Sequence, residues 1–176
     1  LQVNTRFGGD TTTFAIRGFS QELRTTAAVG VYFAEVVAPR GANSQNSGDG
    51  AGPGDFFDLQ NVQVLKGPQG TLFGRNSTGG AILITPQRPT EDLGGYLEGS
   101  AGNYDMWRTQ GVFNTPAGDR VRLRVGIDHQ ERDGYLDNWS GIGPEHFGNL
   151  DYTALRASAV IDITDTIENY AIVRST

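Results

Sequence analysis

The amino-acid sequence predicts a mainly β protein whose strands are joined by long polar loops. Glycine supplies 25 of the 176 residues, roughly twice its usual share, and a glycine inside a helix costs up to about 1 kcal/mol relative to alanine. Several stretches alternate apolar and polar residues, as strands with two different faces do. No apolar run approaches the ~20 residues that a membrane-spanning helix requires. These observations argue against a helix-rich fold and exclude a helical membrane protein for this segment.

The composition also limits the chemistry and the partners. The formal charge is −6, whereas a nucleic-acid-binding domain usually carries a basic patch, so no nucleic-acid partner is expected. The sequence contains no cysteine, which excludes disulfides, thiolate metal sites and cysteine nucleophiles. It starts without a targeting signal and stops within a strand-like pattern. We therefore expect it to be part of a longer chain.

The first half of the sequence contains four strand candidates that are rich in β-branched and aromatic residues. They are residues 12–17, 28–37, 61–65 and 81–85. Residues 38–55, between the second and third candidates, are rich in glycine, proline, asparagine and glutamine, and we predict a loop there. A linker to a second domain is the alternative interpretation of this segment. The character of the sequence changes near residues 86–93.

The second half shows the clearest alternation, in residues 120–132 and 151–163. In the first of these stretches, alternate positions form an apolar face, namely Val121, Leu123, Val125 and Ile127. Further strand candidates are residues 95–103, 107–115 and 166–174. Tight turns are expected at 116–119 and 164–165, and a long polar loop at 133–150. Short turns at one end of the strands and longer loops at the other are typical of an outer-membrane β-barrel.

A soluble antiparallel sheet with one buried face would show the same alternation. The length of the candidates distinguishes the two interpretations, because strands of globular proteins usually have about five or six residues. A tilted strand that crosses a membrane has ~9–11, which suits the candidates of the second half. Five strands cannot close a barrel, since the smallest bacterial barrels use about eight. Membrane strands would therefore be the start of a larger barrel.

One segment of the sequence carries a specific family motif. Residues 62–89 read VQVLKGPQGTLFGRNSTGGAILITPQRP, and this segment resembles the plug domain of a TonB-dependent outer-membrane receptor. The matching residues are Lys66, Gly67, Pro68, Gln69, Leu72, Gly74, Gly79, Gly80, Ile82, Ile84 and Thr85. Residues 16–18 (IRG) resemble an earlier plug strand of that family. Residues 95–108 and 123–138 resemble its first barrel hairpin and its third strand with the following loop.

The resemblance implies a fold, a location and a function. The fold would be a plug domain with a small mixed sheet and long loops, followed by the first antiparallel strands of a large transmembrane β-barrel. Residues 1–90 would be the plug domain and 91–176 the first barrel strands. The protein would carry out TonB-dependent active transport of a scarce nutrient, such as a ferric siderophore or similar metal chelate, across the bacterial outer membrane. It would not be an enzyme and would hold no cofactor or resident metal.

The same resemblance implies partners and residue roles. The partners would be TonB with its inner-membrane energising complex, outer-membrane lipid and lipopolysaccharide, and a small-molecule cargo. Ligand-facing residues are expected to be Arg17, Phe19, Gln21, Arg40, Asn43 and Gln45. Structural and gating roles are expected for Lys66, Gly67, Pro68, Gln69, Gly70, Leu72, Gly74, Arg75, Gly79 and Gly80. Residues expected to face the barrel lumen are Arg122, Arg124, Asp128 and Arg156.

The glycines and the proline of the motif have a physical reason to be there. Gly67, Gly70 and Gly74 permit backbone conformations and close approaches that a Cβ would obstruct. Pro68 fixes its own φ angle and disfavours a helical conformation at Gly67. One departure from the family lies upstream, where the family commonly has valine-tyrosine-valine-aspartate-glycine-valine. Here the corresponding residues 31–36 read VYFAEV.

Other functions are weighed against this one. A phosphate-binding loop requires a lysine directly after the last glycine of its motif, whereas Arg75 follows Gly74 here. The histidines, His129 and His146, lack the spacing of a helical metal-binding pair. A non-transporting, β-rich binding or adhesion module is the alternative function from another class.

Overall fold

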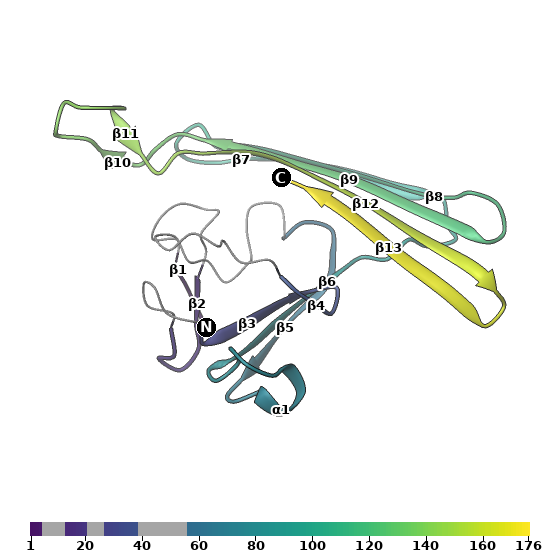
Figure 1. Cartoon of the computed structure of the whole chain (residues 1–176). Coiled ribbons are helices and arrows are strands. Elements are labelled where there is room, and N and C mark those ends of the chain that lie inside the picture. The colour runs from purple at the N-terminus through teal and green to yellow at the C-terminus, as the bar shows by residue number, and fades with distance from the viewer. Residues whose placement is uncertain (5–12, 21–26, 39–55) are drawn as a thin grey trace. The chain divides into compact units, whose positions relative to one another are not determined.

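The computed structural model describes residues 1–4, 13–20, 27–38 and 56–176. The chain forms two compact units, Leu1–Gln87 and Arg88–Thr176 (Figure 1). Nearly all regular structure in the described residues is β, as the sequence predicts. Among these residues, no helix is long and apolar enough to cross a membrane.

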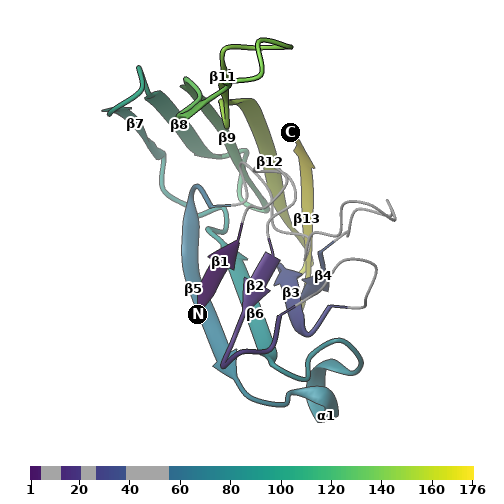
Figure 2. The same ribbon diagram turned by 90° about the vertical axis from the view of Figure 1, so that its left-hand side faces the viewer.

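The first unit is built around a four-stranded mixed sheet, in the order β4-β3-β6-β5 (Figure 2). Its strands are β3 (Val29–Phe33), β4 (Val36–Val37), β5 (Leu59–Lys66) and β6 (Gly80–Pro86). β3 and β6 are parallel, whereas β5 pairs with β6 and β4 with β3 in antiparallel fashion. The short strands β1 (Gln2–Asn4) and β2 (Thr13–Ala15) form a separate antiparallel pair.

The core of this unit lies on the two parallel strands at its centre. Every residue of β3 is buried, and Val31, Ile82 and Ile84 are at most 2% exposed. A strand that is covered on both faces carries a continuous apolar run instead of an alternating one. The sequence VGVYF of β3 shows that pattern.

The predicted strand at residues 28–37 is wrong as a single element. The structure divides it into β3 and β4, and Ala34 and Glu35 form the two-residue turn between them, with φ angles of 49° and 68°. A type I′ turn, one of the two favoured turns of two-residue hairpins, needs positive φ at both central residues. The turn could not be predicted from the sequence, because alanine and glutamate rarely occupy the two central positions of a hairpin turn.

The second unit is a five-stranded antiparallel sheet, in the order β13-β12-β9-β8-β7 (Figure 1). Its strands are β7 (Gly94–Ala101), β8 (Trp107–Pro116), β9 (Val121–Arg132), β12 (Leu150–Thr164) and β13 (Ile167–Ser175). The long connection between β9 and β12 contains a small hairpin of β10 (Leu136–Asp137) and β11 (His146–Phe147). The sequence predicts the five long strands but not this hairpin.

The strand register gives this sheet two chemically different faces. Val125 lies opposite Phe113 of β8 and Ala157 of β12, so apolar side chains from neighbouring strands share one face. On that face Leu97, Phe113, Val125, Leu155 and Val173 are 81%, 56%, 53%, 50% and 72% exposed. The opposite face carries arginine, aspartate, asparagine and tyrosine side chains.

Candidate functional site

The glycine-proline motif forms a closed loop at the end of the first unit's sheet. Residues 67–79 connect β5 to its neighbour β6, and the loop is closed at its base by a hydrogen bond from Gly67 N to Gly79 O of 3.0 Å. A second cross-loop bond runs from Gln69 N to Ser77 O, at 2.9 Å. The loop is therefore an ordered extension of the β5–β6 hairpin.

The tip of the loop contains the one helix among the described residues, α1 (Gly70–Phe73). The hydroxyl of Tyr32 on β3 donates a hydrogen bond to Phe73 O at 2.9 Å. The two rings also pack together, with centroids 4.8 Å apart. Leu72, on the same helix, is 79% exposed. Tyr32 thus holds α1 against the sheet, while the other side of α1 is free for a contact.

The glycines of the motif have different roles. Gly67 and Gly74 have φ angles of 102° and 71°, where a side chain would be strained. Gly70 has no positive φ, and among the described residues no atom lies within 4 Å of a Cβ built there. The expectation that a Cβ would be obstructed at Gly70 is therefore wrong. The tightest positions are Gly79 and Gly80. A Cβ on Gly79 would lie 2.6 Å from Phe19 Cβ, and one on Gly80 would lie 2.3 Å from Leu65 O.

Two expected ligand-facing residues lie next to the base of this loop. Arg17 occupies a tight turn closed by reciprocal hydrogen bonds of 3.1 and 3.0 Å between Ile16 and Phe19. A Cβ on Gly67 would lie 3.7 Å from the guanidinium nitrogen Nη1 of Arg17, and Phe19 contacts Gly79. Both side chains are exposed. The other expected ligand-facing residues, Gln21, Arg40, Asn43 and Gln45, lie outside the described residues.

The four residues expected to face a lumen share one face of the second unit's sheet. Arg122, Arg124 and Asp128 occupy alternate positions of β9. Arg156 of β12 lies directly opposite Gly126, which belongs to the same alternating set. Because directly paired residues project to the same side of a sheet, Arg156 shares the face of the three β9 residues.

Asp128 is the centre of a buried polar cluster on that face. Arg108 of β8 donates two hydrogen bonds to its carboxylate, from Nε at 2.7 Å and from Nη2 at 2.9 Å. The hydroxyl of Tyr152 donates a third, at 2.9 Å. The side chain of Asp128 is 0% exposed. Sequence reasoning missed Arg108 and Tyr152, although the alternation of β8 and β12 places both on the polar face.

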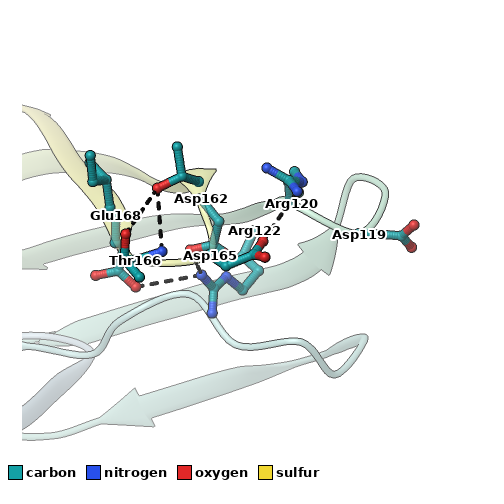
Figure 3. Close-up of a pocket in the computed structure, with 9 residues that line it drawn as sticks. Asp119, Arg120, Arg122, Asp162, Asp165, Thr166 and Glu168 are labelled. Atoms are coloured by element: carbon teal, nitrogen blue, oxygen red, sulfur yellow. Dashed lines mark hydrogen bonds and ion pairs between the residues drawn. The ribbon is translucent and has the colours of Figure 1, made fainter.

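A polar pocket lies at the end of the sheet where β12 turns into β13 (Figure 3). Arg122 donates a hydrogen bond of 2.6 Å to Asp162 and one of 3.5 Å to Glu168. Arg120 and Asp165 form an exposed ion pair at 3.2 Å beside it. The pocket is lined by both acidic and basic side chains, so it presents no surface of a single charge.

Comparisons with known proteins identify the first unit. Residues 1–81 match the family described as TonB-dependent Receptor Plug Domain. The pesticin receptor of Yersinia pestis is 40% identical over 82 residues, which cover 46% of this chain and 12% of that protein. The ferripyoverdine receptor of Pseudomonas aeruginosa is 28% identical over 115 residues, covering 63% and 14%.

The similarity in structure extends over both units. The ferric yersiniabactin uptake receptor FyuA from Yersinia pestis matches 98% of this chain with a TM-score of 0.79 and 26% identity, over 26% of its own length. The chain therefore resembles TonB-dependent receptors, through its plug-domain match over residues 1–81 and through the fold of both units. It spans about an eighth of the length of the curated relatives that it matches.

Proposed function

We propose that this chain is the plug domain and the first five barrel strands of a receptor that imports a ferric siderophore or a similar metal chelate. Transport would cross the bacterial outer membrane and depend on TonB. The observation that carries this proposal is the order in which two different units follow each other along one chain. A plug-type unit with its closed glycine loop is followed directly by long antiparallel strands with one apolar and one polar face.

The apolar face supports a position in the membrane. The side chains of Leu97, Phe113, Val125 and Val173 are all more than half exposed, whereas soluble proteins rarely expose a contiguous apolar patch this wide. β8, β9 and β12 have 10, 12 and 15 residues, which is enough for a tilted crossing of ~9–11 residues. This face would contact outer-membrane lipid and lipopolysaccharide.

The polar face supports a hydrated interior. Arg122, Arg124, Asp128 and Arg156 would face the barrel lumen. Ion pairs in a solvated setting are each worth about 1 kcal/mol or less. A plug held mainly by such contacts can be displaced by a partner, whereas an apolar interface of equal size would lock it. The partner that supplies the pull would be TonB, driven by its inner-membrane complex.

The chemical class of the cargo follows from the relatives. The printed names of several describe receptors for ferripyoverdine, for catecholate siderophores and for ferric yersiniabactin. In this chain Arg17 supplies an exposed cation beside the plug loop, and Phe19 an exposed aromatic ring. We place both in the ligand-binding surface, together with Gln21, Arg40, Asn43 and Gln45. The chelate would be cargo, and the receptor would hold no cofactor of its own.

The test uses cells that produce the complete receptor under iron limitation. We expect energy-dependent accumulation of radioactive iron supplied as a siderophore, and we expect a protonophore to abolish it while surface binding persists. Binding without accumulation would favour the β-rich binding or adhesion module. A receptor that fails to partition with outer membranes would contradict the proposed location.

The ligand-facing residues are tested separately by equilibrium binding. Arg17→Ala and Asn43→Ala should each weaken siderophore binding, because each removes a polar contact with the cargo. Arg75→Ala is the matched control, since Arg75 is an exposed arginine of the same unit that we do not place in the binding surface. Equal affinity in both test variants and the wild-type receptor would remove these residues from the proposed site.

A further inference from the structure

Asn114 binds the chain segment that precedes the first strand of the second unit. Its side-chain oxygen accepts a hydrogen bond from Thr90 N at 3.0 Å. Its amide nitrogen donates to Thr90 O at 3.0 Å, to the Thr90 hydroxyl at 2.9 Å and to Asp92 O at 2.6 Å. One side chain that is 2% exposed thus pairs both backbone groups of Thr90, as a neighbouring strand would.

Charged and aromatic side chains hold the same segment from other strands. Arg88 forms an ion pair with Glu168 of β13, and its guanidinium carbon lies 4.7 Å from the centroid of the Tyr170 ring. Glu91 lies 3.8 Å from Arg122 of β9. We call residues 88–92 the junction segment. The side chains that hold it, namely Asn114, Arg122, Glu168 and Tyr170, are called the clamp.

The clamp begins where the first unit ends. Gln87 N donates a hydrogen bond of 3.0 Å to Asp58 O, within the first unit. The next residue, Arg88, is already bound by the clamp. The two residues at the boundary between the units are therefore both held, Gln87 by the first unit and Arg88 by the clamp. A tension that travels along the chain from the first unit must pass through the Gln87–Arg88 peptide bond and then act on the clamp.

The strand that follows the junction segment is vulnerable to such tension. β7 begins at Gly94, two residues after Asp92, and pairs with β8. Its sequence, GGYLEGSA, contains three glycines, which supply no side chains for packing. If the junction segment were free, tension would act directly on the first residues of β7.

We propose that the clamp is a mechanical stop, and that Asn114 is the positioning residue that keeps the junction segment on the sheet while the plug is pulled. Extension of the chain during transport then ends at Arg88, and the barrel strands stay paired. This inference rests on the proposed function, because only a transport cycle driven by a pulling partner loads the junction in this way.

The test is single-molecule pulling on the complete receptor in a lipid bilayer, from the N-terminal end of the chain. In the wild-type receptor, extension should stop at Arg88. In Asn114→Leu, the stop should give way at lower force, and the extended chain should be longer by about 2 nm, the length of residues 88–93 at roughly 3.5 Å each. The matched control is Asn169→Leu, at an exposed asparagine of β13, which should leave the stop unchanged.

Glu168→Gln is a second variant for the case that Asn114→Leu does not assemble. It keeps the shape of the side chain but weakens its contacts with Arg88 and Arg122, and it should also lower the force at the stop. If a variant that assembles shows the extended length and the force at the stop of the wild-type receptor, the clamp proposal is wrong. Siderophore binding without applied tension should be the same in all variants, which separates the clamp from a residue of the binding site.

The two proposals can fail independently. If the wild-type receptor accumulates no iron, the proposed function fails, and pulling still decides whether the clamp exists. If accumulation is normal and pulling shows no stop at Arg88, the clamp alone is wrong. If the clamp works in transport, Asn114→Leu should also lose energy-dependent accumulation, whereas Asn169→Leu should keep it.

Discussion

Arg108 of β8 and Asp128 of β9 are diagonal neighbours in the strand pair and are joined by two hydrogen bonds of 2.7 and 2.9 Å. The side chain of Asp128 is 0% exposed and that of Arg108 is 26% exposed. Such two-bond pairs between arginine and a carboxylate fix the geometry of both groups. The contact therefore ties two neighbouring strands together on the polar face of the sheet.

Removing one partner of this pair should be costly. Asp128→Ala leaves Arg108 and the Tyr152 hydroxyl without their acceptor, and we expect a loss of about 3–5 kcal/mol in the free energy of unfolding. Arg120→Ala breaks an ion pair whose partners are 58% and 93% exposed, and it should cost less than about 1 kcal/mol. Denaturant unfolding of the complete receptor, followed by tryptophan fluorescence, measures both. Similar losses in the two variants would contradict the structural role of Asp128.

Gly80 should not tolerate a side chain. Its φ angle is 151°, and a Cβ would lie 2.3 Å from Leu65 O and 2.8 Å from Ile16 Cδ1. Strain and overpacking together predict that Gly80→Ala lowers the local free energy of opening by about 2–4 kcal/mol. Gly70→Ala is the control, because Gly70 lies in α1 with open space around it. Hydrogen exchange of the peptide that contains β6 reports the difference, and equal exchange in both variants would argue against it.

Substitutions in the turn between β3 and β4 should stabilise the hairpin that these strands form. Ala34 and Glu35 both have positive φ angles, a conformation that asparagine and glycine adopt more easily in two-residue hairpin turns. The double change Ala34→Asn, Glu35→Gly should stabilise the hairpin by about 1 kcal/mol. Glu35→Val should have the opposite effect, because a β-branched side chain is disfavoured there. The exchange rate of the Ala38 amide, which donates to Val31 O at 2.9 Å, measures both changes.

The Tyr32 hydroxyl should stabilise the plug loop by a modest amount. Tyr32→Phe keeps the ring contact with Phe73 but removes the hydrogen bond to its carbonyl, and we expect a loss of about 0.5–1.5 kcal/mol. The effect should appear as faster hydrogen exchange in residues 67–79. Tyr104→Phe, at a tyrosine that is 57% exposed, should leave that exchange unchanged. Loss of protection in both variants would mean that the hydroxyl is not the cause.

The long strands could be predicted because their signals are local. A period of two along β9 and β12, with turn residues at their ends, needs no knowledge of the rest of the chain. The strands β1, β4, β10 and β11 have two or three residues each. Strands this short depend on the partner with which they pair, so the sequence around them carries too little periodicity to reveal them.

The candidate site could be predicted only in part. The motif identified the loop at residues 67–79 and its glycines, and alternation placed Arg122, Arg124 and Asp128 on one face. Asn114 and Arg108 were missed, because their roles depend on residues distant in the chain that folding brings next to them, Thr90 and Asp128. The assignment of Arg17 and Phe19 to ligand binding stays a prediction, as does the assignment of the polar face to a lumen.

The sequence by itself determined the β class, the resemblance to a receptor plug domain and the two faces of the long strands, because glycine content, a contiguous motif and alternation are all read along the chain. The tertiary structure alone decided that Gly80 has no room for a Cβ, that Tyr32 holds α1, and that Asn114 binds the junction segment. Each of these depends on contacts between residues 15 to 64 positions apart in the chain. Folding alone brings the two residues of each pair together, since no local pattern in the chain between them encodes their contact.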